Sequence, residues 1–407
     1  MANTVLTPTV VTREVLRILH NNLTFCRNIN RQYDNSHKNS GQRDGGTLKV
    51  RLPNKYTTST GAALSIQDTT ESSVTLTRGT QRHVDTNFTT EELTQDLDDF
   101  STRILEPAGS VLASMTDYDA MSMYQDVYNL VGTPGTTPAT ALVLLDAHKY
   151  MNYFATPQSQ RYAALNPDAN AALVDGLKGL YNAQGTISKN YKSGLMANNQ
   201  LGYSELSMTQ NVRTHTTGSD AAASLLVDEP GGTNLVEGSA ILDIDGGGAS
   251  GTLKNGDVFT IANVYSVNPE TKQSTGQLQQ FNCTADATAD GAGQYLSVAF
   301  SPAFYAASGG LQNVDALPVN NAAITVVGAA STGYPQNLAY HRDAFILSTA
   351  DLEMPKGVHF SAREVMDGIS MRCVRQYRIG TDDIPCRFDV LYGYVTARPE
   401  MACRITG

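Results

Sequence analysis

The chain of 407 residues has 41% apolar and 17% charged residues and a formal net charge of −10, which fits two or three globular domains and excludes a disordered chain. The negative charge disfavours binding of nucleic acid over the whole surface. No basic and apolar leader begins the sequence, and no apolar run reaches the roughly 18 residues of a membrane span, so we expect neither a signal peptide nor a spanning helix.

The N-terminal region is basic. The first 57 residues carry nine basic and three acidic side chains, a net charge of +6. We expect an extended arm over residues 1–10 and then a short helix over residues 13–22, with Thr12 as its N-cap. Residues 27–46 are polar and rich in Asn, which is typical of a loop.

Residues 46–88 predict a long two-stranded hairpin. Apolar and polar residues alternate at 47–52 and again at 73–77. This excursion has too few large apolar side chains for a core of its own, and an isolated hairpin is marginally stable in water. We therefore expect it to lie on another surface, which in a homo-oligomer is a neighbouring subunit.

The strongest helical periodicity follows the start signal of Thr89 and Thr90 and recurs from Leu93 to Tyr118. If the helix continues to Leu130 it would be about 60 Å long, at about 1.5 Å per residue, which suits a spine rather than the core of a small domain. Pro107 should kink the helix or occupy the first turn of a second one. The apolar stripe consists of Leu93, Leu97, Phe100, Ile104, Ala108, Val111, Met115 and Tyr118.

Opposite charges suggest a contact between subunits. Residues 91–106 hold six acids and one arginine, a net charge of −5. The contact would join Lys49, Arg51 and Lys55 of one subunit to Glu91, Glu92, Asp96, Asp98 and Asp99 of the next. Two separately solvated faces are the alternative. Arg13 and Arg17, one helical turn apart and close to Glu14, suit weak contacts with a phosphate backbone or a partner protein.

The charge changes abruptly in the middle of the chain. A Gly, Thr and Pro segment at 132–138 precedes an α+β pattern over 139–205. Residues 219–334 then hold two basic residues against eleven acids, a net charge of −9, and no arginine. Strand signals separated by Gly-rich turns predict a small closed or nearly closed β-barrel there, set into a host domain that resumes near Tyr334. The signals lie at residues 240–242, 258–261, 264–267, 278–281, 295–298 and 324–327. After the return, residues 369–379 and 386–396 predict two antiparallel strands.

Motifs of catalysis are missing from the sequence. It contains no phosphate loop, dinucleotide fingerprint, zinc-protease motif or serine-hydrolase motif. His341, Arg342 and Asp343 invite a catalytic interpretation, but a structural role is far more common for such a group. Residues 243–246 resemble the start of a calcium loop, yet the twelfth position is Lys254, so the EF-hand pattern fails. The five cysteines are widely spaced, without a C-x-x-C pair, and predict buried free thiols in a reducing cytoplasm.

The order of these elements resembles the major capsid proteins of tailed phages with the HK97 fold. That order is an N-terminal arm, an extended hairpin (the E-loop), a long spine helix, an axial domain and a return to the peripheral domain. The sequence is similar to the P22-like coat proteins, whose axial domain carries an inserted β-barrel. The resembling segments are 103–108 (RILEPA), 129–136 (NLVGTPGT), 256–261 (GDVFTI), 279–281 (QQF), 337–345 (NLAYHRDAF), 391–394 (LYGY) and 397–400 (ARPE).

The resemblance implies an α+β, HK97-type capsid fold with an inserted all-β barrel domain. The implied divisions are an arm and short helix (1–45), an E-loop hairpin (46–88), a peripheral domain (89–132 and 355–407), an axial domain (133–218 and 335–354) and an inserted barrel (219–334). The implied function is that of a major capsid protein, which self-assembles as hexamers and pentamers into an icosahedral shell around double-stranded DNA. No catalysis, cofactor or metal is expected.

The partners implied by the resemblance are a scaffolding protein, a portal protein, packaged DNA on the inner face and, as a further expectation, a decoration protein. Assembly is expected in the host cytoplasm, and the mature location is the virion. Arg13, Glu14 and Arg17 would then face scaffold or DNA. The alternatives are an encapsulin-like nanocompartment shell, which the insert disfavours, an enzyme built around His341, and a β-rich tail or adhesin component, which the spine helix disfavours.

Overall fold

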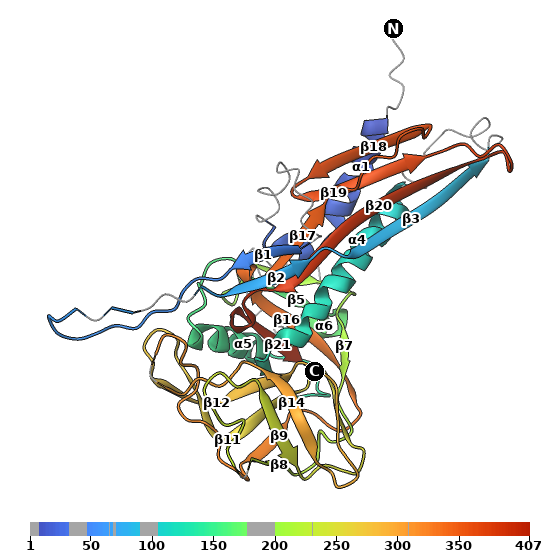
Figure 1. Cartoon of the computed structure of the whole chain (residues 1–407). Coiled ribbons are helices and arrows are strands. Elements are labelled where there is room, and N and C mark those ends of the chain that lie inside the picture. Colours follow the sequence, from blue (N-terminus) through green and yellow to red (C-terminus); the bar gives the residue numbers. More distant parts are fainter. Residues whose placement is uncertain are drawn as a thin grey trace. The chain divides into compact units, whose positions relative to one another are not determined.

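The computed structural model describes residues 8–31, 47–64, 66–67, 71–89, 105–176, 200–229, 231–307 and 309–407. The chain forms two compact units, each built from segments that are far apart in the sequence. The first comprises Met1–Arg51, Ser73–Met121 and Phe345–Ala397, and the second Leu52–Ser72, Ser122–Ala344 and Arg398–Gly407. Both units combine helices with sheets, so the predicted α+β class is confirmed (Figure 1).

Helix α1 (Pro8–Asn22) packs on α4 (Glu106–Ala120) in the first unit, and the short α2 (Phe25–Asn28) follows α1. A Cβ atom at Gly109 would lie 3.0 Å from Cγ2 of Ile18, so this glycine allows the close approach of the two helices. α1 begins earlier than predicted, because proline is well tolerated in the first turn of a helix. Residues 8–10 are therefore helical and do not belong to an extended arm.

The described part of the predicted spine is α4. Pro107 lies in its first turn, one of the two positions expected for this residue. The 3₁₀ helix η3 (Met121–Asp126) follows, so the α-helix does not continue to residue 130. Residues 90–104, which hold the N-terminal part of the predicted spine, lie outside the described residues.

The buried face of α4 differs from the predicted apolar stripe. Val111 and Tyr118 are 54% and 38% exposed, whereas Asp117 and Asp119 are buried. Small residues bring α1 against the neighbouring face, and the two acids have hydrogen-bond partners in the interior. Apolar periodicity alone therefore predicts the burial of Ala108 correctly but misassigns Val111 and Tyr118.

A five-stranded sheet packs on α1 and α4 in the first unit. The long strand β20 pairs with β3 along one edge and with β19 and β17 along the other. Asp367 and Gly368, with φ values of 49° and 78°, form the two-residue turn from β18 to β19. The strands are β3 (Thr80–Thr89), β17 (Phe345–Ala350), β18 (Phe360–Met366), β19 (Ile369–Arg375) and β20 (Asp383–Thr396).

The hairpin strands β1 (Thr47–Arg51) and β2 (Ser73–Thr77) pair with each other in antiparallel register. The predicted hairpin covers residues 46–88, but residues 80–89 do not continue it. They pair instead with residues 383–392 of β20, which supply hydrogen-bond partners to one edge of β3 along its whole length.

A second sheet, in the order β4-β21-β16-β5-β6 with β7 paired to β16, lies in the second unit. Helix α5 packs on it through Leu144, Ala147 and Met151, so the apolar run at 141–145 is helical. The strands are β4 (Leu130–Val131), β5 (Arg161–Leu165), β6 (Glu205–Met208), β7 (Thr214–Thr216), β16 (Gly333–His341) and β21 (Ala402–Thr406). The helices are α5 (Ala141–Tyr153), α6 (Pro167–Gly176), η5 (Arg342–Ala344) and η6 (Pro399–Met401).

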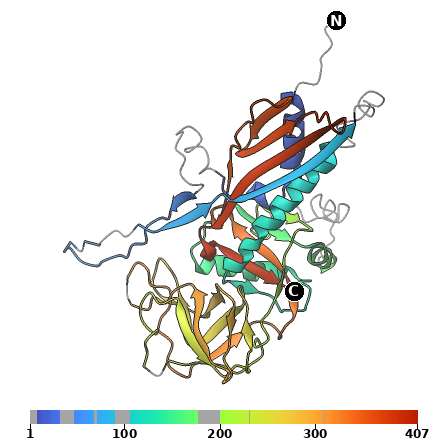
Figure 2. The ribbon, with the colours of Figure 1, turned by 45° about the vertical axis from the view of Figure 1, so that its right-hand side comes forward.

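The second unit also contains a closed barrel, in the order β11-β12-β14-β9-β8-β15 (Figure 2). Its core is aromatic: the ring of Phe300 lies 4.7 Å from that of Phe304 and 5.5 Å from that of Phe281. The signals predicted at 258–261 and 264–267 belong to one strand, which is interrupted at Asn263. The strands are β8 (Leu225–Val227), β9 (Ile241–Asp245), β11 (Val258–Val267), β12 (Ser274–Cys283), β14 (Tyr295–Ser301) and β15 (Ala323–Val326), beside a small pair of β10 (Thr252–Leu253) and β13 (Ala287–Thr288).

Candidate assembly surfaces

The three predicted arm residues lie on α1, where the charges partly neutralise one another. Arg17 donates two hydrogen bonds to the carboxylate of Glu14, at 3.0 and 2.6 Å. These bonds lower the pKa of Glu14 and raise that of Arg17. The side chain of Arg13 is 66% exposed, and its guanidinium lies 3.7 Å from Glu364 of β18. Arg13 therefore presents the most accessible cationic group of the three.

Of the predicted basic residues in the hairpin region, Lys49 and Arg51 lie on the same exposed face of β1. Leu48 and Val50 alternate with them and are buried on the opposite face. Lys55 belongs to the second unit, where its charge, together with burial, lowers the pKa of Lys272. The structure thus groups Lys49 with Arg51 and places Lys55 on a different unit.

The acidic residues predicted to meet this basic face are Glu91, Glu92, Asp96, Asp98 and Asp99, and all of them lie outside the described residues. The attraction between the two faces therefore stays a prediction. On α4 itself, Asp117 and Asp119 are buried with internal partners, whereas Glu106 is exposed.

Asp119 on α4 joins β3 to β20. Its carboxylate accepts hydrogen bonds from Nε and Nη2 of Arg82, at 2.9 and 3.0 Å, and from the hydroxyl of Tyr392, at 2.6 Å. The bond to Asp119 raises the pKa of Arg82, while burial and then the same carboxylate raise that of Tyr392. Sequence reasoning missed this residue because no local pattern distinguishes an acid with distant partners from a solvated one.

The loop of residues 52–72 exposes large apolar side chains. Leu64 is 87% exposed, Ile66 is 82% exposed and Tyr56 is 55% exposed. Two points of the loop are joined, because the side-chain amide of Gln67 accepts from the backbone nitrogen of Thr57 at 2.9 Å and donates to its carbonyl at 2.5 Å. The described part of this loop therefore presents three large apolar side chains to solvent. The sequence analysis identified the excursion but not these anchors.

Arg404 links β21 to the barrel in the interior of the second unit. It is fully buried; Nε donates to the carbonyl of Val127 at 2.6 Å and Nη1 donates to that of Gly256 at 2.7 Å. Its guanidinium lies 5.5 Å from the ring centre of Tyr124. Burial lowers the pKa of Arg404 to about 10. One C-terminal side chain therefore holds the turn before β11 against the segment that follows α4.

A second polar cluster supports the same attachment. Nε2 of His215 on β7 lies 2.8 Å from Oδ1 of Asp257, and the other oxygen of Asp257 accepts from the backbone nitrogens of Gly218 and Lys254 at 3.0 and 2.7 Å. Gln280 of β12 bonds the backbone nitrogen and carbonyl of Leu130 through its side-chain amide, at 2.7 and 2.9 Å. Several directional hydrogen bonds thus attach the barrel to the rest of the second unit.

His341, the centre of the rejected catalytic interpretation, is 3% exposed. Its Nδ1 accepts from the backbone nitrogen of Asp343 at 3.2 Å, and burial lowers its pKa. The carboxylate of Asp343 lies farther away, at 3.8 Å. Within the described ranges, no three His, Cys, Asp or Glu side chains gather in a metal-binding arrangement.

A family model described as P22 coat protein, gene protein 5, matches residues 1–407. The chain belongs to the P22 coat protein family. The coat protein is a major capsid protein that forms the icosahedral shell of a bacteriophage, and it is a structural protein rather than an enzyme. Membership of this family favours the phage shell over an encapsulin-like compartment.

Solved structures similar to the coat protein include one described as Mycobacterium phage Che8, with a TM-score of 0.44 and 11% identity over 94% of this chain and 90% of that chain. Another is the capsid of the cyanophage P-SCSP1u, with a TM-score of 0.42 and 11% identity over 89% of this chain and 83% of that chain. A third is the mature capsid of bacteriophage PhiM1, with a TM-score of 0.42 and 10% identity over 89% of this chain and 82% of that chain. These scores are low, and the assignment depends on the family match alone. A comparison with curated protein sequences finds no match.

The location of the coat protein is the capsid of the virion. Of the helices that the structure describes, none is long and apolar enough to cross a membrane.

Proposed function

We propose that this coat protein encloses the double-stranded DNA of a tailed phage in an HK97-type shell, and that residues 52–72 lie on a neighbouring copy. The observation that carries the proposal is the exposure of Leu64 and Ile66, at 87% and 82%. Full burial of one such side chain contributes roughly 1.5–3 kcal/mol. A second copy of the chain would supply the covering surface, and a shell repeats that contact for every subunit.

The proposed domain division follows the family. It comprises an arm and short helix (1–45), an E-loop (46–88), a peripheral domain (89–132 and 355–407), an axial domain (133–218 and 335–354) and an inserted barrel (219–334). We depart from this division at one point: because β3 pairs with β20, residues 80–89 are assigned to the peripheral domain and the E-loop ends before residue 80. The net charge of −9 in residues 219–334 suits a surface that faces away from packaged DNA.

The exposed cations suggest two further contacts. Lys49 and Arg51, on one face of β1, would attract the acids at positions 91–99 of a neighbouring copy. Arg13, the most exposed charge of its group on α1, would contact either scaffolding protein or DNA phosphates, with Glu14 and Arg17 beside it. A portal protein and a decoration protein complete the proposed partners, and assembly would take place in the host cytoplasm.

The test is electron microscopy of the full chain expressed with and without its scaffolding protein, together with the double variant Leu64→Ser, Ile66→Ser. We expect closed icosahedral shells from the wild type, and folded subunits with a shell yield reduced about tenfold or more from the variant, because each copy loses two apolar anchors. Leu296→Ser, at a position 73% exposed on the barrel, is the matched control and should assemble normally. Normal shells from the double variant would refute the role of the loop, and the lack of shells from the wild type with scaffold would refute the assembly route.

A further inference from the structure

A segment of the barrel meets the base of the loop of residues 52–72 within the second unit. A Cβ atom built on Gly310, which lies between β14 and β15, would overlap the carbonyl oxygen of Lys55 and lie 3.6 Å from the nitrogen of Tyr56. The φ angle of Gly310 is not positive, so the close approach of two backbones, rather than backbone strain, requires glycine here. The two segments, far apart in the chain, are therefore in direct main-chain contact.

Lys272 holds Gly310 in this position. Its Nζ donates hydrogen bonds to the carbonyl of Gly310 at 2.8 Å and to that of Gln312 at 3.4 Å. Hydrogen bonds from a charged donor are stronger than those between neutral groups. Burial, and then the charge of Lys55, lower the pKa of Lys272, which agrees with the closeness of the two lysines. One ammonium group thus binds two carbonyls of the barrel segment 309–313.

The turn that carries Lys272 is anchored to helix α5. The side-chain oxygen of Asn268 accepts from the backbone nitrogens of Glu270 and Thr271, at 2.9 and 3.0 Å. The carbonyl of Asn268 accepts from the backbone nitrogen of Lys272 at 3.0 Å, and its Nδ2 donates to the carbonyl of Tyr153 at 3.2 Å. Tyr153 is the last residue of α5. A set of polar contacts therefore connects α5, through the barrel, with the base of the loop.

The other end of the segment is bonded to the barrel wall. The carbonyl of Asn313 accepts from the backbone nitrogen of Val267 on β11 at 3.0 Å. The side chain of Asn313 accepts from the backbone nitrogen of Tyr305 at 3.0 Å and donates to the carbonyl of Ala303 at 2.7 Å. The surface that meets the loop is thus held from two sides, at Lys272 and at Asn313.

We propose that the barrel segment 309–313 is a brace that holds the base of the loop of residues 52–72, and so sets the direction in which Leu64 and Ile66 leave the subunit. A loop held at its base loses less conformational freedom when a neighbouring copy covers it, so the brace favours the contact between copies. The brace itself is a contact within one chain. Only its consequence for assembly rests on the proposed function.

Trypsin tests the contact directly, because it cleaves the peptide bond after Lys55, whose carbonyl oxygen meets Gly310. A protease cuts a bond that is free to leave its native contacts. Gly310→Val cannot keep the contact, so we expect cleavage after Lys55 in the folded full-length subunit to become about tenfold faster than in the wild type. Mass spectrometry at short digestion times measures the rate. Lys272→Met removes the donor, leaves Gly310 in place and should give a smaller increase.

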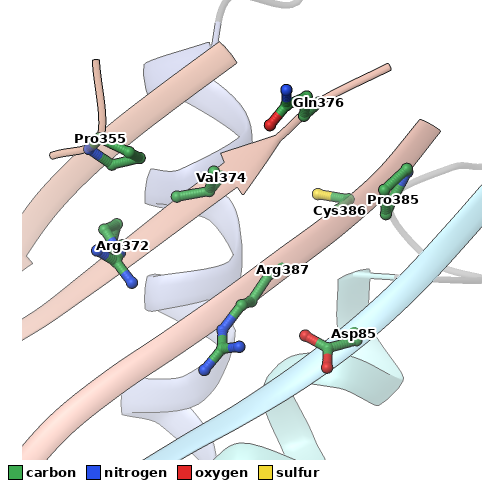
Figure 3. Close-up of a pocket in the computed structure, with 8 residues that line it drawn as sticks. All are labelled: Asp85, Pro355, Arg372, Val374, Gln376, Pro385, Cys386 and Arg387. Atoms are coloured by element: carbon green, nitrogen blue, oxygen red, sulfur yellow. The ribbon is translucent and has the colours of Figure 1, made fainter. Parts of the chain in front are cut away.

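Gly291→Val is the matched control. It adds the same side chain to another turn of the barrel, where φ is not positive and a Cβ atom would meet no heavy atom of the described residues within 4 Å. Gln376→Ala is the control for a surface substitution in the first unit. Gln376 lines an open cavity of about 520 Å³ between β3, β19 and β20 (Figure 3). Both controls should be cleaved after Lys55 at the wild-type rate.

The brace is refuted if Gly310→Val and Lys272→Met are both cleaved after Lys55 at the wild-type rate. An increase in Gly291→Val equal to that in Gly310→Val would refute it as well. Circular dichroism shows whether each variant is folded, and Lys272→Met decides the question if Gly310→Val is not. Shell yield is a separate measurement: normal shells from the double variant of the loop would refute the role of the loop in assembly and leave the brace intact.

Discussion

Asp117 on α4 caps the backbone of α2, because its Oδ1 accepts a hydrogen bond from the nitrogen of Cys26 at 2.8 Å. Its Oδ2 accepts from the nitrogen and the hydroxyl of Thr24, at 2.7 and 2.9 Å. A helix as short as α2 is unstable alone, and its first nitrogens lack partners within the helix. One buried carboxylate, 91 residues away along the chain, therefore satisfies them and fixes the end of the N-terminal segment on the first unit.

Substitution Asp117→Asn should lower the free energy of unfolding by about 2 kcal/mol, since hydrogen bonds to a charged group are lost and an amide nitrogen would face donors. The measurement is the midpoint of urea unfolding of the soluble subunit. Glu106→Gln, on the exposed side of the same helix, is the matched control and should change the midpoint little. Equal midpoints for Asp117→Asn and the wild type would show that the cap contributes nothing to stability.

The attachment of the barrel predicts a second large effect. Arg404→Met keeps most of the side-chain volume but leaves the carbonyls of Val127 and Gly256 without their donor, and we expect a loss of about 2–4 kcal/mol. Thermal unfolding measures the loss, and limited proteolysis should show earlier cleavage between the barrel and its host. Arg342→Met, at a half-buried arginine of the same unit, provides the comparison. A barrel that stays equally protected in Arg404→Met would contradict the role of this arginine.

Local features of the fold could be predicted from the sequence because they depend on residues close together in the chain. Alternation of apolar residues located the strands at 258–261 and 278–281, and the charge break located the segment that contains the barrel. Proline chemistry placed Pro107 in the first turn of a helix as one of two options. The same local rules predicted the start of α1 too late, because no residue within 8–12 separates an extended arm from the helix.

Features that depend on distant partners could not be predicted. Strand β3 pairs with β20, and the register between them has no local signal. Asp119 resembles a solvated acid until Arg82 and Tyr392 are placed beside it. The predicted strand ends, 379 and 386, would have put Cys373 opposite Tyr392, whereas the observed register puts it opposite Phe388. The sulfurs of Cys373 and Cys386 lie 3.7 Å apart, and the predicted strand ends do not bring them together.

Two histidines predict how stability depends on pH. Burial lowers the pKa of His148 and of His341 below the ordinary value of 6.5, and His148 also lies 3.0 Å from the guanidinium of Arg161. The unfolded chain binds protons at these sites more readily than the folded chain, so stability is retained above the unfolded pKa and falls as pH decreases below about 6.5. Urea unfolding at about pH 7.5 and about pH 5.5, on either side of the ordinary histidine pKa of about 6.5, measures this loss of stability.

The double variant His148→Asn, His341→Asn should have a smaller loss of stability over that pH range than the wild type has. His359→Asn, at an exposed position, is the control for the loss of one imidazole. Hydrogen bonds from Arg378 and Thr381 lower the pKa of Asp383. Protonation of this carboxylate therefore reduces stability only at a more acidic pH than the range measured here. An identical pH dependence in the double variant and the wild type would exclude the histidines as the cause.

Charge reversal tests the proposed contact between copies. Lys49→Glu with Arg51→Glu should slow shell assembly about tenfold at low salt, because two attractive contacts become repulsive, while the exposed positions leave the folded subunit stable. Adding Asp98→Lys and Asp99→Lys to the same chain should restore assembly, since the two faces again carry opposite charge. Light scattering measures the rate of shell assembly. Added salt should reduce the difference in rate between variant and wild type, because the screening length falls to about 8 Å at physiological ionic strength. Lys254→Glu on the barrel is the control for added negative charge. A quadruple variant as slow as the basic-face variant alone would show that these residues do not meet.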